Sequence, residues 1–127
     1  MSVEVPDHET SKMLAQAGFE LSPSPMWVFD METLSFLAVN KAAERVYGYS
    51  SREFLAMTIL DIRPKEDIAP LLKEHFGEHK HHIEGEAWVH RKKNGGLIRV
   101  EITSHQTIFN RRPAEIVSVT IKESLSR

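Results

Sequence analysis

The sequence predicts an α+β domain, with a five-stranded antiparallel sheet and with short helices and one longer helix packed on one face. Two short apolar runs, residues 26–29 and 34–39, are typical of buried strands, and helix signals follow from residue 40 to about residue 82. From residue 86 onward the apolar residues recur with a period of two, which indicates three further strands. Strands separated in this way from a run of helices favour an antiparallel sheet.

Composition restricts the classes of protein to which the chain can belong. Its 127 residues are enough for one domain with a core of its own, and the net charge of −2 leaves no electrostatic footprint for nucleic acid. No apolar run approaches the ~20 residues of a membrane span, and no signal peptide is visible. Cysteine is absent, which excludes disulfides, thiolate catalysis and thiol-linked cofactors. We expect a cytoplasmic protein, which this lack of cysteine permits.

The first 21 residues are expected to flank the domain, which we place at residues 22–125. Residues 1–8 are polar and tail-like, and residues 9–21 predict an amphipathic helix that starts at Thr10 or Ser11. Its apolar stripe consists of Met13, Leu14, Ala17 and Leu21. The two prolines of the stretch 22–25 then prevent the helix from continuing.

Capping signals place two short helices directly after the second strand. Asn40 can cap the first helix, and Gly48 supplies the left-handed residue that closes it. Ser50 and Glu53 form a capping box for the second helix, with Tyr49 and Phe54 as its hydrophobic staple.

A longer helix over about residues 68–82 is predicted next, with Asp67 as its N-cap. Its apolar stripe is Ile68, Leu71, Leu72 and Phe76. The three C-terminal strands are predicted at residues 86–91, 97–109 and 115–123. The turn at residues 94–96 contains two adjacent glycines, which favour a hairpin, and a second turn is expected at residues 110–113.

The order and spacing of these signals resemble the PAS domain, a sensory and interaction module of signalling proteins. The resemblance is carried by Asn40, Ala43, the run Gly48-Tyr49-Ser50, Glu53 and Leu55, and later by the turn Arg91-Lys92-Lys93-Asn94-Gly95. It extends from about residue 22 to residue 123. One departure concerns the last strand, where Thr120 and Lys122 replace the Asp and Thr with which many members pass the signal onward. The resemblance also raises the expectation that the chain is a piece of a larger receptor.

The resemblance implies a small-molecule or cofactor site between the sheet and the longer helix, with relay to an output domain such as a histidine kinase. Period two places Trp88 and His90 on one face of their strand, which borders that site in the family. The residues expected to line it are Phe29, Asn40, Tyr47, Phe54, Leu72, Phe76, Trp88 and His90. The alternative is a ligand-free interaction module. We expect a homodimer formed through the N-terminal helix and the sheet face.

The histidines raise the question of a metal or haem. His75, His79 and His82 share one helical face, but a polar helix end explains them more simply, so no metal site is predicted. Lys80 falls where haem-binding members carry their proximal histidine, with His79 and His81 one position away. Haem and non-covalent flavin stay open as cofactors, and neither is favoured.

An enzyme is the least favoured class, and we predict that the domain is not catalytic. No local catalytic motif is present, and Glu86 and His90 are the one conceivable acid–base pair. An ordinary polar strand face explains this pair better.

Overall fold

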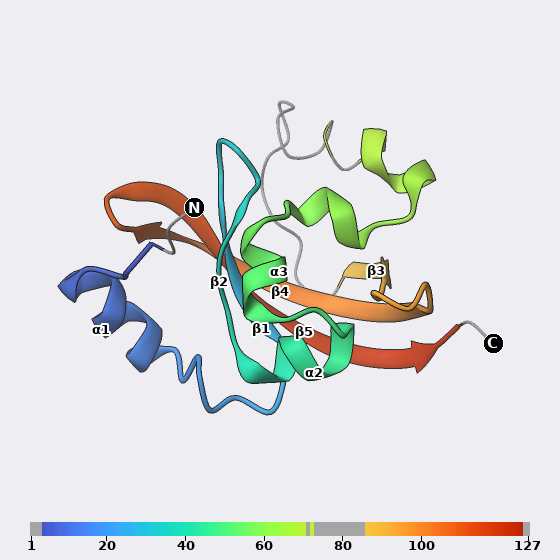
Figure 1. Ribbon diagram of the computed structural model, residues 1–127, viewed down its shortest axis with the longest axis horizontal. Coiled ribbons are helices and arrows are strands. Elements are labelled where there is room, and N and C mark those ends of the chain that lie inside the picture. The colour runs from blue at the N-terminus through green and yellow to red at the C-terminus, as the bar shows by residue number, and fades with distance from the viewer. Residues whose placement is uncertain (1–3, 71, 73–85, 126–127) are drawn as a thin grey trace.

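The computed structural model describes residues 4–70, 72 and 86–125, with residues 86 and 87 described by their backbone alone. A curved sheet carries the short helices α2 and α3 over one face, and α1 lies apart from them (Figure 1). In chain order the elements are α1 (His8–Gln16), β1 (Met26–Asp30), β2 (Phe36–Val39), α2 (Lys41–Tyr47), α3 (Ser51–Leu55), the 3-10 turns η1 (Ile59–Ile62) and η2 (Lys65–Asp67), β3 (Glu86–Arg91), β4 (Leu97–Phe109) and β5 (Arg112–Ser124). Residues 68–70 and 72 are helical and belong to the predicted longer helix.

The five-stranded antiparallel sheet predicted from the sequence is confirmed. The strand order is β2-β1-β5-β4-β3, so the two N-terminal strands join the C-terminal meander through β1 and β5. The pairing of β1 with β5 runs from Met26 opposite Ser118 to Asp30 opposite Ala114. Strand β3 pairs with β4 over its full length, which makes it one edge of the sheet.

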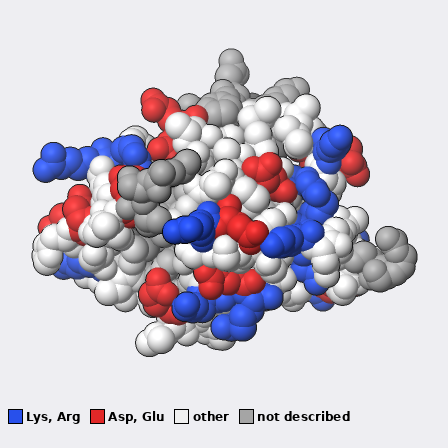
Figure 2. Space-filling view, viewed as in Figure 1, with Lys and Arg blue, Asp and Glu red and all other residues white. Residues whose placement is uncertain are grey.

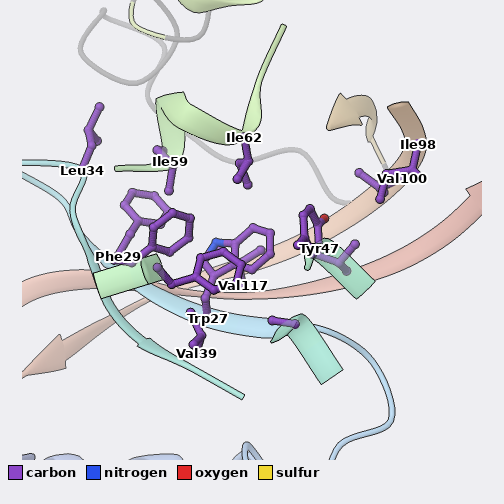
Figure 3. Close-up of a cluster of buried hydrophobic side chains, with 14 residues drawn as sticks. Trp27, Phe29, Leu34, Val39, Tyr47, Ile59, Ile62, Ile98, Val100 and Val117 are labelled. Atoms are coloured by element: carbon purple, nitrogen blue, oxygen red, sulfur yellow. The ribbon is translucent and has the colours of Figure 1, made fainter. Parts of the chain in front are cut away.

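Alternation along β1 divides its side chains between two hydrophobic clusters, because successive strand residues point to opposite faces. Trp27 and Phe29 belong to the inner core, and Met26 and Val28 belong to the outer core. The inner core lies between the sheet and the segment that contains α2, α3 and η1 (Figure 3). The outer core consists of Phe19, Met26, Val28, Phe109 and Ala114, with Leu14, Leu37, Ala38 and Ile116 packed against it.

Helix α1 covers the outer core, and its limits differ from those predicted. It begins at His8 because the Asp7 side chain accepts a hydrogen bond from the Thr10 N–H at 2.8 Å, so the predicted start at Thr10 or Ser11 is wrong. The helix ends at Gln16, and Gly18 follows with a left-handed φ of 64°. Leu14 packs against the outer core, whereas Leu21 of the predicted stripe is 94% exposed.

The capping signals of α2 and α3 are confirmed. The Asn40 side chain accepts from the Ala43 N–H at 2.9 Å, and Gly48 closes α2 with φ 87°. Ser50 and Glu53 form the complete capping box of α3. The rings of Tyr49 and Phe54 meet edge to face, with centroids 5.5 Å apart, as the staple requires.

One expected boundary is corrected by local backbone geometry. The sequence predicts the second strand from residue 34, but Leu34 has a left-handed φ of 67° and β2 starts at Phe36. The longer helix begins at Ile68, as predicted. Asp67, its predicted N-cap, is the last residue of the 3-10 turn η2, and the N-cap of that turn is Pro64.

The last hairpin is longer than predicted. The turn consists of Asn110 and Arg111 alone, with φ values of 47° and 71°, so β5 begins at Arg112 rather than at residue 115. Two left-handed residues in a row match the right-handed twist of the flanking strands, which allows pairing to continue to the end of the hairpin.

The surface carries charges of both signs in alternation on the face seen in Figure 2, in agreement with the small net charge. Within the described parts of the chain, no helix has the length and apolar character that crossing a membrane requires.

Candidate functional site

The structure brings most of the predicted wall residues to the inner face of the sheet. Phe29, Tyr47 and Phe54 are buried in the inner core, and Leu72 and Trp88 are half-buried against it. His90 is buried beside them, as its contact with Tyr47 shows. Phe76 lies outside the described residues.

Aromatic side chains fill the centre of this face. The Trp27 ring meets Phe36 and Tyr47 edge to face, with centroids 5.6 and 5.5 Å apart. Phe54 meets Phe36 in the same way at 5.0 Å. Such T-shaped pairs add a specific attraction to the burial of apolar area, so this part of the wall is packed core.

A polar pair lies at the border of the aromatic cluster. The Tyr47 hydroxyl oxygen is 2.6 Å from His90 Nδ1, and both residues are buried. Burial lowers the pKa of His90 to about 3, with a further contribution from the positive charge of Arg63. Burial also raises the pKa of the Tyr47 hydroxyl. The pair is therefore neutral near pH 7, and the protonated hydroxyl of Tyr47 can donate to an unprotonated Nδ1 of His90.

Arg63 is a buried cation that the sequence analysis did not identify as a site residue. Its side chain is 5% exposed, and its guanidinium carbon lies 4.3 Å from the centroid of the Trp88 ring. Arg63 Nη2 is 3.6 Å from Asp67 Oδ2. The following Pro64 favours the extended backbone that Arg63 adopts, with φ −114° and ψ 148°. A charged residue before a proline was the available signal.

An open pocket of about 260 Å³ adjoins this Arg63–Trp88 pair. It is lined by Arg63, Asp67, Pro70, Trp88, Val89 and Arg99. It lies between the start of the longer helix and the edge strand β3, and Trp88 is the predicted wall residue that lines it. Among the residues that the structure describes, the buried indole Nε1 of Trp88 has no hydrogen-bond partner. A polar atom buried without a partner is uncommon in folded proteins and calls for an explanation.

Asn40 belongs to the frame of the fold. Its Oδ1 accepts from the N–H groups of Met26 and Ala43, and its Nδ2 donates to the carbonyls of Phe19 and Ser24. A carboxamide has two acceptor sites and two donor hydrogens, so Asn40 has no capacity left for a ligand. We therefore remove it from the candidate site.

The positions considered for metal, haem and catalysis fall largely outside the described part of the chain. This holds for His75, His79, Lys80, His81 and His82, and for the side chain of Glu86. Among the residues that the structure does describe, no group of three His, Asp or Glu side chains could hold a metal ion.

Comparison with known proteins supports one family. Residues 12–87 match the family model described as PAS domain. No curated protein matches the chain.

Solved structures share the fold at low sequence identity. A PAS domain from a two-component sensor histidine kinase is 22% identical, with a TM-score of 0.72, over 91% of this chain and 100% of that one. A domain of a sensory box sensor histidine kinase/response regulator from Geobacter sulfurreducens is 22% identical, with a TM-score of 0.63, over 88% and 96%. A PAS domain from Colwellia psychrerythraea is 16% identical, with a TM-score of 0.69, over 91% and 97%.

Proposed function

Because this chain belongs to the PAS domain family, we propose that it is the sensory module of a signal-transduction protein. It binds a small molecule in the pocket between β3 and the start of the longer helix. It passes the change to an attached output domain, such as a histidine kinase, in the cytoplasm. The domain itself is not catalytic.

The pocket beside Trp88 is the observation that carries this proposal. Its volume of about 260 Å³ is slightly below the usual range for ligands of drug size, so a compact molecule fits. Its wall combines the apolar surface of Trp88, Val89 and Pro70 with the charged groups of Arg63, Asp67 and Arg99. A mostly apolar wall with a few polar groups is typical of small-molecule sites.

The ion pairs of the sheet offer a route from this pocket to the C-terminal end of β5. Arg99 lines the pocket on β4, and its guanidinium pairs with the carboxylate of Glu123 near the end of β5. Lys122 pairs with Glu101 of β4 at 3.7 Å. We propose this route in place of the Asp and Thr that Thr120 and Lys122 replace. A ligand changes the output only if it favours one of two packings of these strands.

An interaction module is the second candidate, and the packing of the aromatic cluster favours it. Tyr47 and Phe54 are completely buried, so protein side chains fill the centre of the inner face where the structure describes it. Another hollow, lined by Met13 of α1 and by Ile108 of β4, lies at the helix and the sheet end expected to form a homodimer. Ile108 is 58% exposed and can therefore contribute apolar area to such a contact.

Native mass spectrometry and absorption spectroscopy of the protein as purified test the first proposal. A co-purified small molecule that is lost in the Trp88→Ala variant, but kept in Arg91→Gln, supports the sensor. Arg91 lies on the same strand and is exposed. A colourless protein of the bare mass that forms a stable dimer supports the interaction module.

A further inference from the structure

The Trp88 indole marks the polar end of the proposed ligand site. Its Nε1 can only donate a hydrogen bond, it is shielded from solvent, and the described residues offer it no acceptor. An unpaired buried donor is costly to leave unsatisfied, so a group that brings an acceptor gains more there than at an exposed donor.

The guanidinium of Arg63 adds a positive charge at the same place. It lies 4.3 Å from the Trp88 ring centroid, and Arg63 is buried whereas Trp88 is half-buried. Asp67, the carboxylate 3.6 Å from Arg63, is about one third exposed and sits at the rim. Near pH 7 the neighbouring His90 is uncharged and neither attracts nor repels an anion.

From these two donors we infer that the pocket selects a small planar molecule that ends in a carboxylate. One carboxylate oxygen accepts from Trp88 Nε1, and Arg63 supplies the compensating charge. The planar body lies against Val89 and Pro70 in the remaining volume. The inference rests on the proposed function, since it names the ligand class of the same pocket.

Three probes of similar size test the chemistry by titration in two-dimensional NMR. Benzoate has a ring and a carboxylate, benzamide has a ring and a neutral acceptor, and toluene has the ring alone. The chain contains two tryptophans, so the indole N–H signals of Trp27 and Trp88 are assigned by comparison with Trp88→Phe. We expect benzoate to shift the Trp88 signal saturably and to leave the Trp27 signal in place. Benzamide should bind more weakly than benzoate, and toluene more weakly than benzamide.

Three variants distinguish the contribution of each donor to binding from the contribution of the shape of the pocket. Trp88→Phe keeps an aromatic ring but removes the N–H, and should weaken benzoate binding about tenfold, followed at the Val89 and Arg99 amides. Arg63→Gln should weaken benzoate more than toluene. Arg91→Gln, which removes one positive charge outside the pocket, should leave both unchanged.

Several outcomes would overturn the inference. Equal affinity for benzoate and toluene, or benzoate binding that Trp88→Phe leaves unchanged, would show that the pocket does not prefer a ligand with a hydrogen-bond acceptor. Either result would leave the sensor proposal intact. A shift of the Trp27 signal instead of the Trp88 signal would place the site elsewhere. If no probe binds at millimolar concentration, the carboxylate class is wrong, while the mass of the protein as purified decides separately whether a ligand of another class is present.

Discussion

At the scale of single residues, His90 makes the stability of the domain depend on pH. Its pKa falls from 6.5 to about 3 because burial penalises the imidazolium. Between these two values the unfolded chain binds a proton that the folded chain does not bind. The contribution of His90 to the free energy of unfolding is therefore complete above pH 6.5 and is lost as the pH falls toward 3.

We expect this single group to lower the free energy of unfolding by about 2 kcal/mol between pH 7 and pH 5. Urea denaturation at both pH values measures the difference. His90→Gln removes the titrating ring but keeps a polar side chain, and it should flatten the pH dependence. A slope that is the same in both proteins would show that folding does not lower the pKa of His90.

Tyr47→Phe tests the hydrogen bond between the same two residues. The variant keeps the edge-to-face contact with Trp27 but leaves His90 Nδ1 buried without its partner. We expect a loss of about 1–3 kcal/mol in the free energy of unfolding at pH 7. The matched control is Tyr49→Phe, because Tyr49 is half-buried and its ring contact with Phe54 needs no hydroxyl. Equal stability of the two variants would contradict a structural role for the Tyr47 hydroxyl.

The sequence predicted residues such as Tyr47 and His90 better than it predicted Arg63. Strand alternation places Trp88 and His90 on one face, and the family resemblance implies Tyr47 as a wall residue beside them. Arg63 is buried by tertiary packing of a loop onto Trp88, and no local periodicity describes such a contact. A pattern within one segment cannot show what another segment covers.

At the scale of elements, Asn110 fastens the N-terminal segment to the β4–β5 turn. Asn110 Nδ2 donates to Glu4 Oε2 at 3.0 Å and to the Val5 carbonyl at 2.9 Å. Asn110 Oδ1 accepts at 2.7 Å from the N–H of Asp7, the N-cap residue of α1. The side chain of Asn110 therefore binds the residues that lead into α1, about a hundred residues earlier in the chain.

Asn110→Gly should loosen α1 without disturbing the turn. Glycine accepts the left-handed φ of 47° and keeps the main-chain bond to Thr10 Oγ1, so only the side-chain bonds are lost. Hydrogen exchange should become severalfold faster in α1 and stay unchanged in the paired centre of β4. Arg111→Gly, at the other left-handed residue of the turn, is the control and should leave α1 protected. Unchanged exchange of α1 in Asn110→Gly would mean that Leu14 and Phe19 hold the helix alone.

The helices α2 and α3, whose ends are marked by local capping residues, were predicted correctly. Strand limits that depend on pairing with another strand were not. Asn40, Gly48 and Ser50 satisfy backbone groups within a few residues, so their signals are readable in the sequence. The start of β5 depends instead on pairing with β4 as far as Phe109 opposite Arg112. The turn signal at residues 110–113 identified the hairpin but could not give its length.

At the scale of the whole molecule, the two hydrophobic clusters explain why the flanking segment matters. The sheet has an apolar inner face under α2, α3 and η1 and an apolar outer face under α1. Phe19, which follows α1, is 1% exposed and lies in the outer core. The flanking residues are thus part of the packed structure, although the sequence suggested a boundary at residue 22.

The proposed homodimer can be tested on the exposed side of α1. Ala17 is exposed and follows Met13 by one helical turn, whereas Thr10 and Leu14 point toward the sheet. Ala17→Glu should therefore shift sedimentation equilibrium toward the monomer by at least about tenfold in dissociation constant, because a carboxylate in an apolar contact must be desolvated. Ala15→Glu places the same charge on an exposed position of the helix that faces away from Met13, and should leave the dimer intact. Neither change touches either core, so both proteins should keep the stability of the original chain. A monomer in all three proteins would remove the dimer proposal, and dissociation by both variants would place the contact elsewhere on α1.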